Sequence, residues 1–191
     1  MNTVEACTIA TVEIKQSKFI AYLVPISEFE GLQEKLRSEH PKSRHVVYAL
    51  RALNTLDQIV ENSSDDGEPK GSSGVPALNV LRGEEMINAA VLIVRYFGGT
   101  KLGIGGLVRA YTQATKEVIA TSDIKEYEKL HMLSYETSYS DVQRIEYLLE
   151  QVGIINVEKV FATEVSWAIT ATQEKLDQFR ELAGRHLSCN V

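Results

Sequence analysis

The chain of 191 residues has 44% hydrophobic side chains, and its 20 Lys and Arg against 26 Asp and Glu give a formal net charge of −6. This acidic balance argues against nonspecific binding of nucleic acid or acidic lipid, which is driven by neutralisation of phosphate. The longest apolar run, residues 89–94, is far shorter than the roughly 20 residues that cross a bilayer, and the start of the chain has no signal-peptide pattern. We therefore expect a cytoplasmic protein with no membrane contact. Cys7 and Cys189 lie near opposite ends, in no metal or redox spacing, so no metal or cofactor is expected.

The first part of the chain alternates expected strands and helices. Apolar residues alternate with mostly polar ones from Val4 to Ile14, and an extended run follows over 19–25, which predicts a hairpin turning at residues 15–17. The next expected elements are a helix over 28–39, strands over 45–51 and 55–60, a turn-rich stretch over 62–74, a helix over 74–81, a buried strand over 89–94 and an amphipathic helix from Leu107 to about Thr121.

A charged connector over 122–128 separates this part from a second series of elements. The series consists of a strand over 129–139, a helix over 141–151, strands over 154–161 and 164–172, a helix over 174–183 and a final strand. The order βαββαβ is typical of ferredoxin-like domains. We therefore expect an α+β protein of two domains, 1–124 and 125–191.

Residues 95–109 combine glycines and cations between the buried strand and a helix N-terminus. Five glycines occur in the nine residues 98–106. Glycine lets backbone amides approach an anion closely, and a helix N-terminus adds partial positive charge. Neither the Gly-Lys-Ser/Thr ending of a P-loop nor the Gly-x-Gly-x-x-Gly dinucleotide spacing is present, so the pattern predicts a phosphate or carboxylate site of another kind, with a purely structural tight turn as the alternative. The expected anion-binding residues are Arg95, Gly98, Gly99, Thr100, Lys101, Gly103, Gly105, Gly106 and Arg109.

A second candidate site is the acidic turn with Asp65, Asp66 and Glu68. Such carboxylates could hold a hard cation, act as acid and base, or bind a basic partner. The same composition is also what a structural turn requires. His45, at the start of an apolar strand, is a further catalytic candidate, although a structural role is the simpler interpretation.

These motifs, taken in order, resemble the IMPACT family and its YigZ-like bacterial members. The resemblance rests on residues 17–21, 45–49, 64–76 and 95–111, and covers the first domain nearly whole. Lys18 stands where the family often has Arg, and residues 70–73 vary the segment after the acidic turn.

The resemblance implies a first domain of the ribosomal-protein and elongation-factor-G domain IV type, with an unusual left-handed βαβ crossover, followed by a ferredoxin-like domain. Eukaryotic members of the family are translational regulators that bind a partner of a stress kinase, and they carry a different accessory domain. The tandem of domains is similar to part of that elongation factor. RNA, the ribosome or a translation-related protein is therefore the implied partner.

Two functions follow as alternatives. The first is a binding or regulatory protein linked to translation, in which Asp65, Asp66 and Glu68 lie against the glycine-rich segment and form an anion-binding cleft with it. The second is an enzyme that acts on a small phosphorylated or carboxylated substrate, with one of these carboxylates as acid, base or metal ligand. The sequence shows no paired nucleophile and base, which disfavours the enzyme. It also shows no aromatic stacking platform, which disfavours extended single-strand binding.

Overall fold

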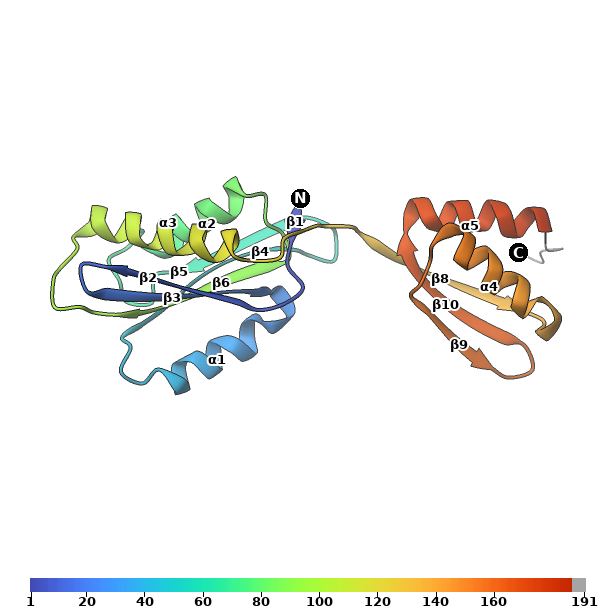
Figure 1. The fold of residues 1–191 in the computed structure, drawn as a ribbon, viewed down its shortest axis with the longest axis horizontal. Helices are drawn as coiled ribbons and strands as arrows, with labels where there is room; N and C mark the ends of the chain where they lie inside the picture. Colours follow the sequence, from blue (N-terminus) through green and yellow to red (C-terminus); the bar gives the residue numbers. More distant parts are fainter. Residues whose placement is uncertain (187–191) are drawn as a thin grey trace. The chain divides into compact units, whose positions relative to one another are not determined.

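The computed structural model describes residues 1–186 and divides the chain into two compact units, Met1–Tyr127 and Glu128–Val191. Each unit packs helices against a β-sheet, which is the α+β organisation expected from the sequence (Figure 1). The short strand β7 (Lys125–Glu126) pairs with β1 (Asn2–Thr3), so this segment, assigned to the second domain by sequence, belongs to the first unit.

The first unit is built on a five-stranded antiparallel sheet with the order β2-β3-β6-β4-β5. Its strands are β2 (Thr8–Ile14), β3 (Ser17–Pro25), β4 (His45–Leu53), β5 (Ile59–Ser64) and β6 (Ala89–Tyr96). The uninterrupted apolar run of β6 is buried on both faces, as expected of a central strand. Because β6 is antiparallel to both β3 and β4, those two strands are parallel, and α1 (Phe29–Glu39) connects them in a βαβ unit.

Helices cover both faces of this sheet. Helix α1 packs on one face, and α2 (Gly74–Gly83) and α3 (Ile104–Ala120) pack on the other (Figure 1). Successive residues of β6 alternate between the two cores, with Ile93 on the side of α2 and α3 and Leu92 on the side of α1.

The strand expected over 55–60 is wrong in its bounds, because β5 begins only at Ile59 and continues to Ser64. Residues 54–58 form a turn instead, in which the Asn54 side chain accepts hydrogen bonds from the amides of Leu56 and Gln58, both at 2.9 Å. Strand β5 then runs into polar residues that the sequence assigns to a turn-rich stretch. As an edge strand with exposed side chains it lacks the apolar alternation that identifies a strand.

The second unit has a three-stranded antiparallel sheet with the order β8-β10-β9. Its elements in chain order are β8 (Leu130–Thr137), α4 (Val142–Val152), β9 (Val157–Phe161), β10 (Val165–Thr172) and α5 (Gln173–His186). Strand β10 lies between β8 and β9, as in a split βαβ unit. The core includes Ile145, Trp167 and Phe179. Five of the six ferredoxin-like elements are thus present in order, and the expected final strand lies outside the described residues.

The structure also bears on membrane contact and metal binding. Within residues 1–186, no helix is long and apolar enough to cross a membrane. No three His, Cys, Asp or Glu side chains of this range converge in the manner of metal ligands. The thiol of Cys7 is free and exposed.

Candidate functional site

Four connections meet at one end of the first sheet. They are the β2–β3 turn (15–16), the α1–β4 loop (40–44), the β5–α2 loop (65–73) and the β6–α3 loop (97–103). The strand register brings them together, because His45 at the start of β4 lies opposite Arg95 near the end of β6, and Lys18 of β3 lies opposite Tyr96. We call the 65–73 connection the acidic turn and the 97–103 connection the glycine loop.

Glu68 joins the acidic turn to the core of the unit. Its Oε1 accepts hydrogen bonds from Arg95 Nη1 at 2.6 Å and from the Tyr111 hydroxyl at 2.9 Å. Only 3% of the Glu68 side chain and 9% of the Arg95 side chain are exposed. Burial and the negative charge of Glu68 raise the pKa of Tyr111, so the phenol stays protonated and donates to the carboxylate.

The Arg95 guanidinium is enclosed by aromatic rings as well as by this ion pair. Its central carbon lies 5.6 Å from the centre of the Phe19 ring and 5.8 Å from that of the Phe97 ring, within the range of cation–π attraction. Its Nε is buried and has no hydrogen-bond partner among the residues that the structure describes. Arg95, expected from sequence to bind an external anion, therefore forms a buried ion pair with Glu68.

Asp65 organises the acidic turn and the start of α2. Its carboxylate accepts hydrogen bonds from the Ser73 hydroxyl at 2.7 Å and from the amides of Gly71, Ser73 and Gly74 at 2.7, 3.0 and 2.9 Å. Burial alone would raise the pKa of Asp65, but these hydrogen bonds outweigh it and lower the pKa. The carboxylate thus occupies the N-terminus of α2 as an internal anion.

Asp66 and His45 fix the same turn to neighbouring elements. One carboxylate oxygen of Asp66 pairs with Arg37 of α1 at 2.9 Å, and the other accepts the Val46 amide at 2.7 Å. The Asp66 carbonyl accepts a hydrogen bond from His45 Nδ1 at 2.7 Å, so this imidazole nitrogen carries a proton. All four residues proposed as catalytic from the sequence are therefore engaged in hydrogen bonds that shape the acidic turn.

The glycine loop is fixed at both of its ends. A Cβ at Gly98 would lie 2.0 Å from the Gln16 carbonyl carbon, so only glycine fits beside the β2–β3 turn, and the Gly98 amide donates to Ser17 Oγ at 3.1 Å. Gly103 has a φ of 70° and its carbonyl accepts the Leu107 amide at 2.9 Å, which starts α3. Gly99, Thr100, Lys101 and Gly105 are exposed between or just beyond these points, and Gly106 is half-buried.

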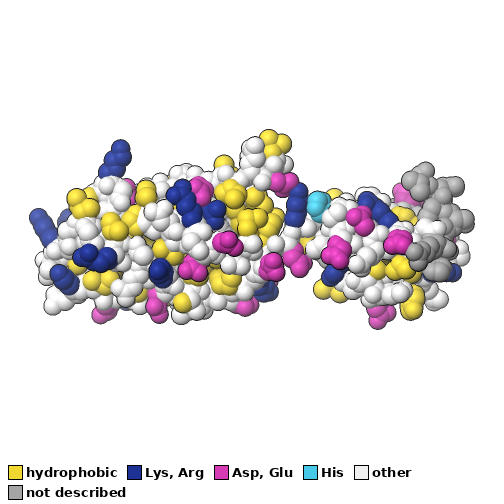
Figure 2. Space-filling model, turned by 90° about the horizontal axis from the view of Figure 1, so that it is seen from above, with side chains coloured by type: hydrophobic (Ala, Val, Ile, Leu, Met, Phe, Trp, Pro, Cys, Tyr) yellow, Lys and Arg dark blue, Asp and Glu magenta, His cyan; other side chains and the backbone are white. Residues whose placement is uncertain are grey.

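Exposed cations surround the glycine loop. Seven Lys and Arg side chains lie in or next to the four connections, namely Lys15, Lys18, Lys42, Arg44, Lys70, Lys101 and Arg109. None of them forms an ion pair with another residue in the described part of the chain. Glu13, opposite Lys18, is an exposed carboxylate at this end. We call this region the basic end, and Figure 2 shows dark blue side chains gathered there, at the left of the first unit.

The basic end was only partly predictable. The glycine pattern identifies Lys101 and Arg109, and a guanidinium nitrogen of Arg109 would lie 3.9 Å from a Cβ at Gly105, beside the first turn of α3. The cations of the other connections are scattered through the sequence. Only the sheet topology brings them to the same end.

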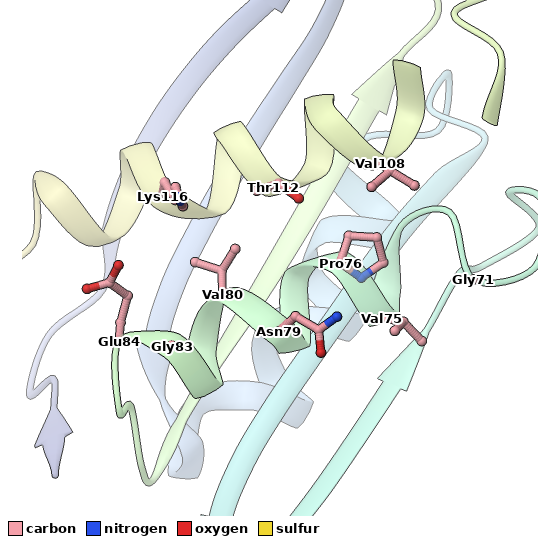
Figure 3. A pocket seen from close by; sticks show the side chains of 10 residues that line it. All are labelled: Gly71, Val75, Pro76, Asn79, Val80, Gly83, Glu84, Val108, Thr112 and Lys116. Atoms are coloured by element: carbon pink, nitrogen blue, oxygen red, sulfur yellow. The ribbon is translucent and has the colours of Figure 1, made fainter. Parts of the chain in front are cut away.

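A separate groove of about 490 Å³ runs between α2 and α3 (Figure 3). Pro76 and Val80 of α2 lie toward Val108 and Thr112 of α3, and Glu84 and Lys116 lie toward one end. The groove contains none of the residues proposed from the sequence as catalytic or anion-binding, although Gly71, whose amide binds Asp65, lies on its rim.

Comparison with known proteins identifies the family. The family model described as the Impact N-terminal domain matches residues 15–119, which include the acidic turn and the glycine loop. This chain belongs to the IMPACT family. It is 32% identical over 175 residues to an IMPACT family member of Haemophilus influenzae, covering 87% of this chain and 82% of that protein. It is 35% identical over 142 residues to the IMPACT family member YigZ of Escherichia coli, covering 73% and 70%.

A solved structure extends the likeness over both units. A crystal structure described as that of a hypothetical protein has a TM-score of 0.68 and 30% sequence identity, covering 97% of this chain and 92% of that one. The α+β architecture of the two units is therefore shared with a relative along nearly the whole chain.

Proposed function

We propose that this protein is a cytoplasmic regulator of translation that binds structured RNA of the translation apparatus through the basic end of its first unit. The observation that carries the proposal is that the carboxylates of the acidic turn are paired within the protein, whereas among the described residues the exposed cations around the glycine loop are not. The three carboxylates of the acidic turn are taken up by hydrogen bonds and ion pairs within the protein, whereas the Lys and Arg side chains around the glycine loop are exposed. Family membership supports the link to translation.

Free cations suit a phosphate backbone. They neutralise phosphates without breaking an existing ion pair, and the released counterions drive association. The first turn of α3 adds amides and partial positive charge beside Arg109.

The opposite end of the same sheet restricts binding to the basic end. Its connections carry the carboxylates Glu28, Glu84, Glu85 and Asp123. With a net charge of −6 for the whole chain, contact of RNA with these surfaces is repulsive. The charge distribution therefore favours one orientation of the first unit on RNA.

The test is binding of the purified protein to structured RNA and to ribosomal subunits across a salt series. The variant is Lys15→Ala with Lys101→Ala, because replacing the buried Arg95 would disturb the core. The slope of log affinity against log salt is negative, and we expect it to become shallower by about 0.9 for each lysine removed.

The matched control compares Lys101→Ala alone with Lys116→Ala, which removes one exposed lysine of α3 away from the basic end that forms no ion pair among the described residues. An equal loss in both variants would make net charge, rather than the basic end, responsible for binding. Absence of binding at low salt would overturn the proposal.

A further inference from the structure

Phe97 is an aromatic side chain held at the surface of the basic end. It follows β6 at the start of the glycine loop, and 56% of it is exposed. Phe19, whose ring also contacts the Arg95 guanidinium, and its neighbour Tyr111 are by contrast fully buried. A large exposed aromatic residue beside free cations indicates a contact surface for a partner.

The Phe97 ring is supported from below by a rigid network. The Arg95 guanidinium lies over the Phe97 ring and over the Phe19 ring, and the ion pair with Glu68 fixes its position. Gly98, the next residue, is fixed against the β2–β3 turn. Because the ring's support is already ordered, a flat ligand that stacks on it loses little conformational freedom in the protein.

The charges around Phe97 select the kind of ligand. Lys15 belongs to the turn whose backbone contacts Gly98, and Lys101 follows in the same loop. A flat aromatic group with phosphates attached is complementary to an exposed ring that has one cation in the neighbouring turn and another in its own loop. An unpaired nucleotide within an RNA chain has both features.

We propose that Phe97 stacks on a single unpaired base of a structured RNA, while Lys15 and Lys101 bind the phosphates on either side of it. This inference rests on the RNA-binding function proposed above and specifies what that site recognises. A single exposed aromatic side chain at the basic end fits one bulged or flipped base, whereas extended single strands require a series of aromatic residues. This proposal departs from the sequence-based prediction that the chain has no aromatic stacking platform.

The test compares two RNA hairpins that differ by one bulged nucleotide in an otherwise paired stem. We expect the protein to bind the bulged hairpin about tenfold more tightly, within the range measured for stacking of one base on an aromatic side chain. In Phe97→Ala the affinity ratio should fall to about one while the salt dependence persists. Phe97→Trp should retain the ratio, and Phe97→Leu, which keeps an apolar side chain without a ring, should lose it.

A direct signal comes from 2-aminopurine placed at the bulge, because stacking of this base on an aromatic ring quenches its fluorescence. If the unsubstituted protein quenches the fluorescence and the Phe97→Ala variant does not, the inference is supported. Equal affinity for both hairpins with a steep salt dependence overturns this inference and leaves RNA binding intact. Loss of ribosomal-subunit binding in Phe97→Ala without discrimination between the hairpins overturns it in favour of a protein contact. No binding of either hairpin overturns the proposed function as well.

Discussion

The acidic turn and the glycine loop lie at the same end of the first sheet, but the carboxylates of the turn are paired within the protein whereas the charge of the loop is exposed. The turn holds the more strongly charged motif, yet Asp65, Asp66 and Glu68 all bond to groups of the protein itself. The loop itself carries one charged side chain, Lys101, which is exposed. Charge in a motif therefore does not by itself identify the binding surface. What matters is which charges the fold leaves unpaired.

Elementary energetics explain this division. A carboxylate that leaves water needs hydrogen bonds or a counter-charge. When the protein itself supplies the partner group, the contact fixes two structural elements to each other. Glu68 joins the turn to β6 and α3, whereas Asp66 joins it to α1 and β4. Changes in the turn should therefore lower stability, and changes of the exposed cations should lower affinity.

The largest expected effect comes from Glu68→Ala, which leaves Arg95 buried without its counter-charge. Breaking a buried ion pair by removing one partner costs about 3–5 kcal/mol in the free energy of unfolding. Urea denaturation monitored by circular dichroism measures the loss. The exposed Glu13 serves as control, since Glu13→Ala should change stability by less than about 0.5 kcal/mol. A loss below about 1 kcal/mol in Glu68→Ala would contradict the structural role of the pair.

A smaller loss is expected for Gly98→Ala, which tests how the glycine loop is fixed. The added methyl would overlap the backbone of the β2–β3 turn, and overpacking of this kind costs about 1–3 kcal/mol. Gly31→Ala is the matched control, because Gly31 lies in α1 with open space around its Cβ position. That change should stabilise the protein by about 0.5–1 kcal/mol. Similar melting temperatures for the two variants would refute the close approach at Gly98.

Asp65→Asn should cost about 2 kcal/mol at neutral pH, because hydrogen bonds to a charged acceptor are weakened. The pKa of Asp65 is lowered in the folded protein, so its carboxylate contributes stability above its unfolded pKa of about 3.9 and loses that contribution as the pH falls through the folded value. The difference in stability between the two proteins should be constant from pH 7 to pH 5 and shrink below about pH 4. Denaturation at several pH values checks this, and a difference that grows on acidification would contradict it.

The fold was largely predictable because its elements carry local patterns. The apolar run of β6 and the helical spacing of α3 identify those elements without knowledge of the fold. Strand β5 was misplaced because an edge strand needs no buried face and the Asn54 turn interrupts the apolar residues.

The candidate site was predictable in its motifs and not in its contacts. Composition identifies the acidic turn and the glycine loop as unusual, but the pairing of Glu68 with Arg95 joins residues 27 positions apart and depends on the β-sheet register. The same holds for Lys15 and Lys42, which reach the basic end only through the strand order. Phe97 lies in the segment 95–111 that carries the family resemblance, but the exposure of its ring is a property of the folded surface and not of the motif.

The most direct test of this division is the salt dependence of RNA binding, measured side by side for Asp65→Asn and for Lys15→Ala with Lys101→Ala. We expect Asp65→Asn to lower the free energy of unfolding but to keep the slope of log affinity against log salt. The lysine variant should keep its stability within about 0.5 kcal/mol, while its slope becomes shallower by about 0.9 for each lysine. A folded Asp65→Asn protein with a reduced slope, or a lysine variant with an unchanged one, would contradict it.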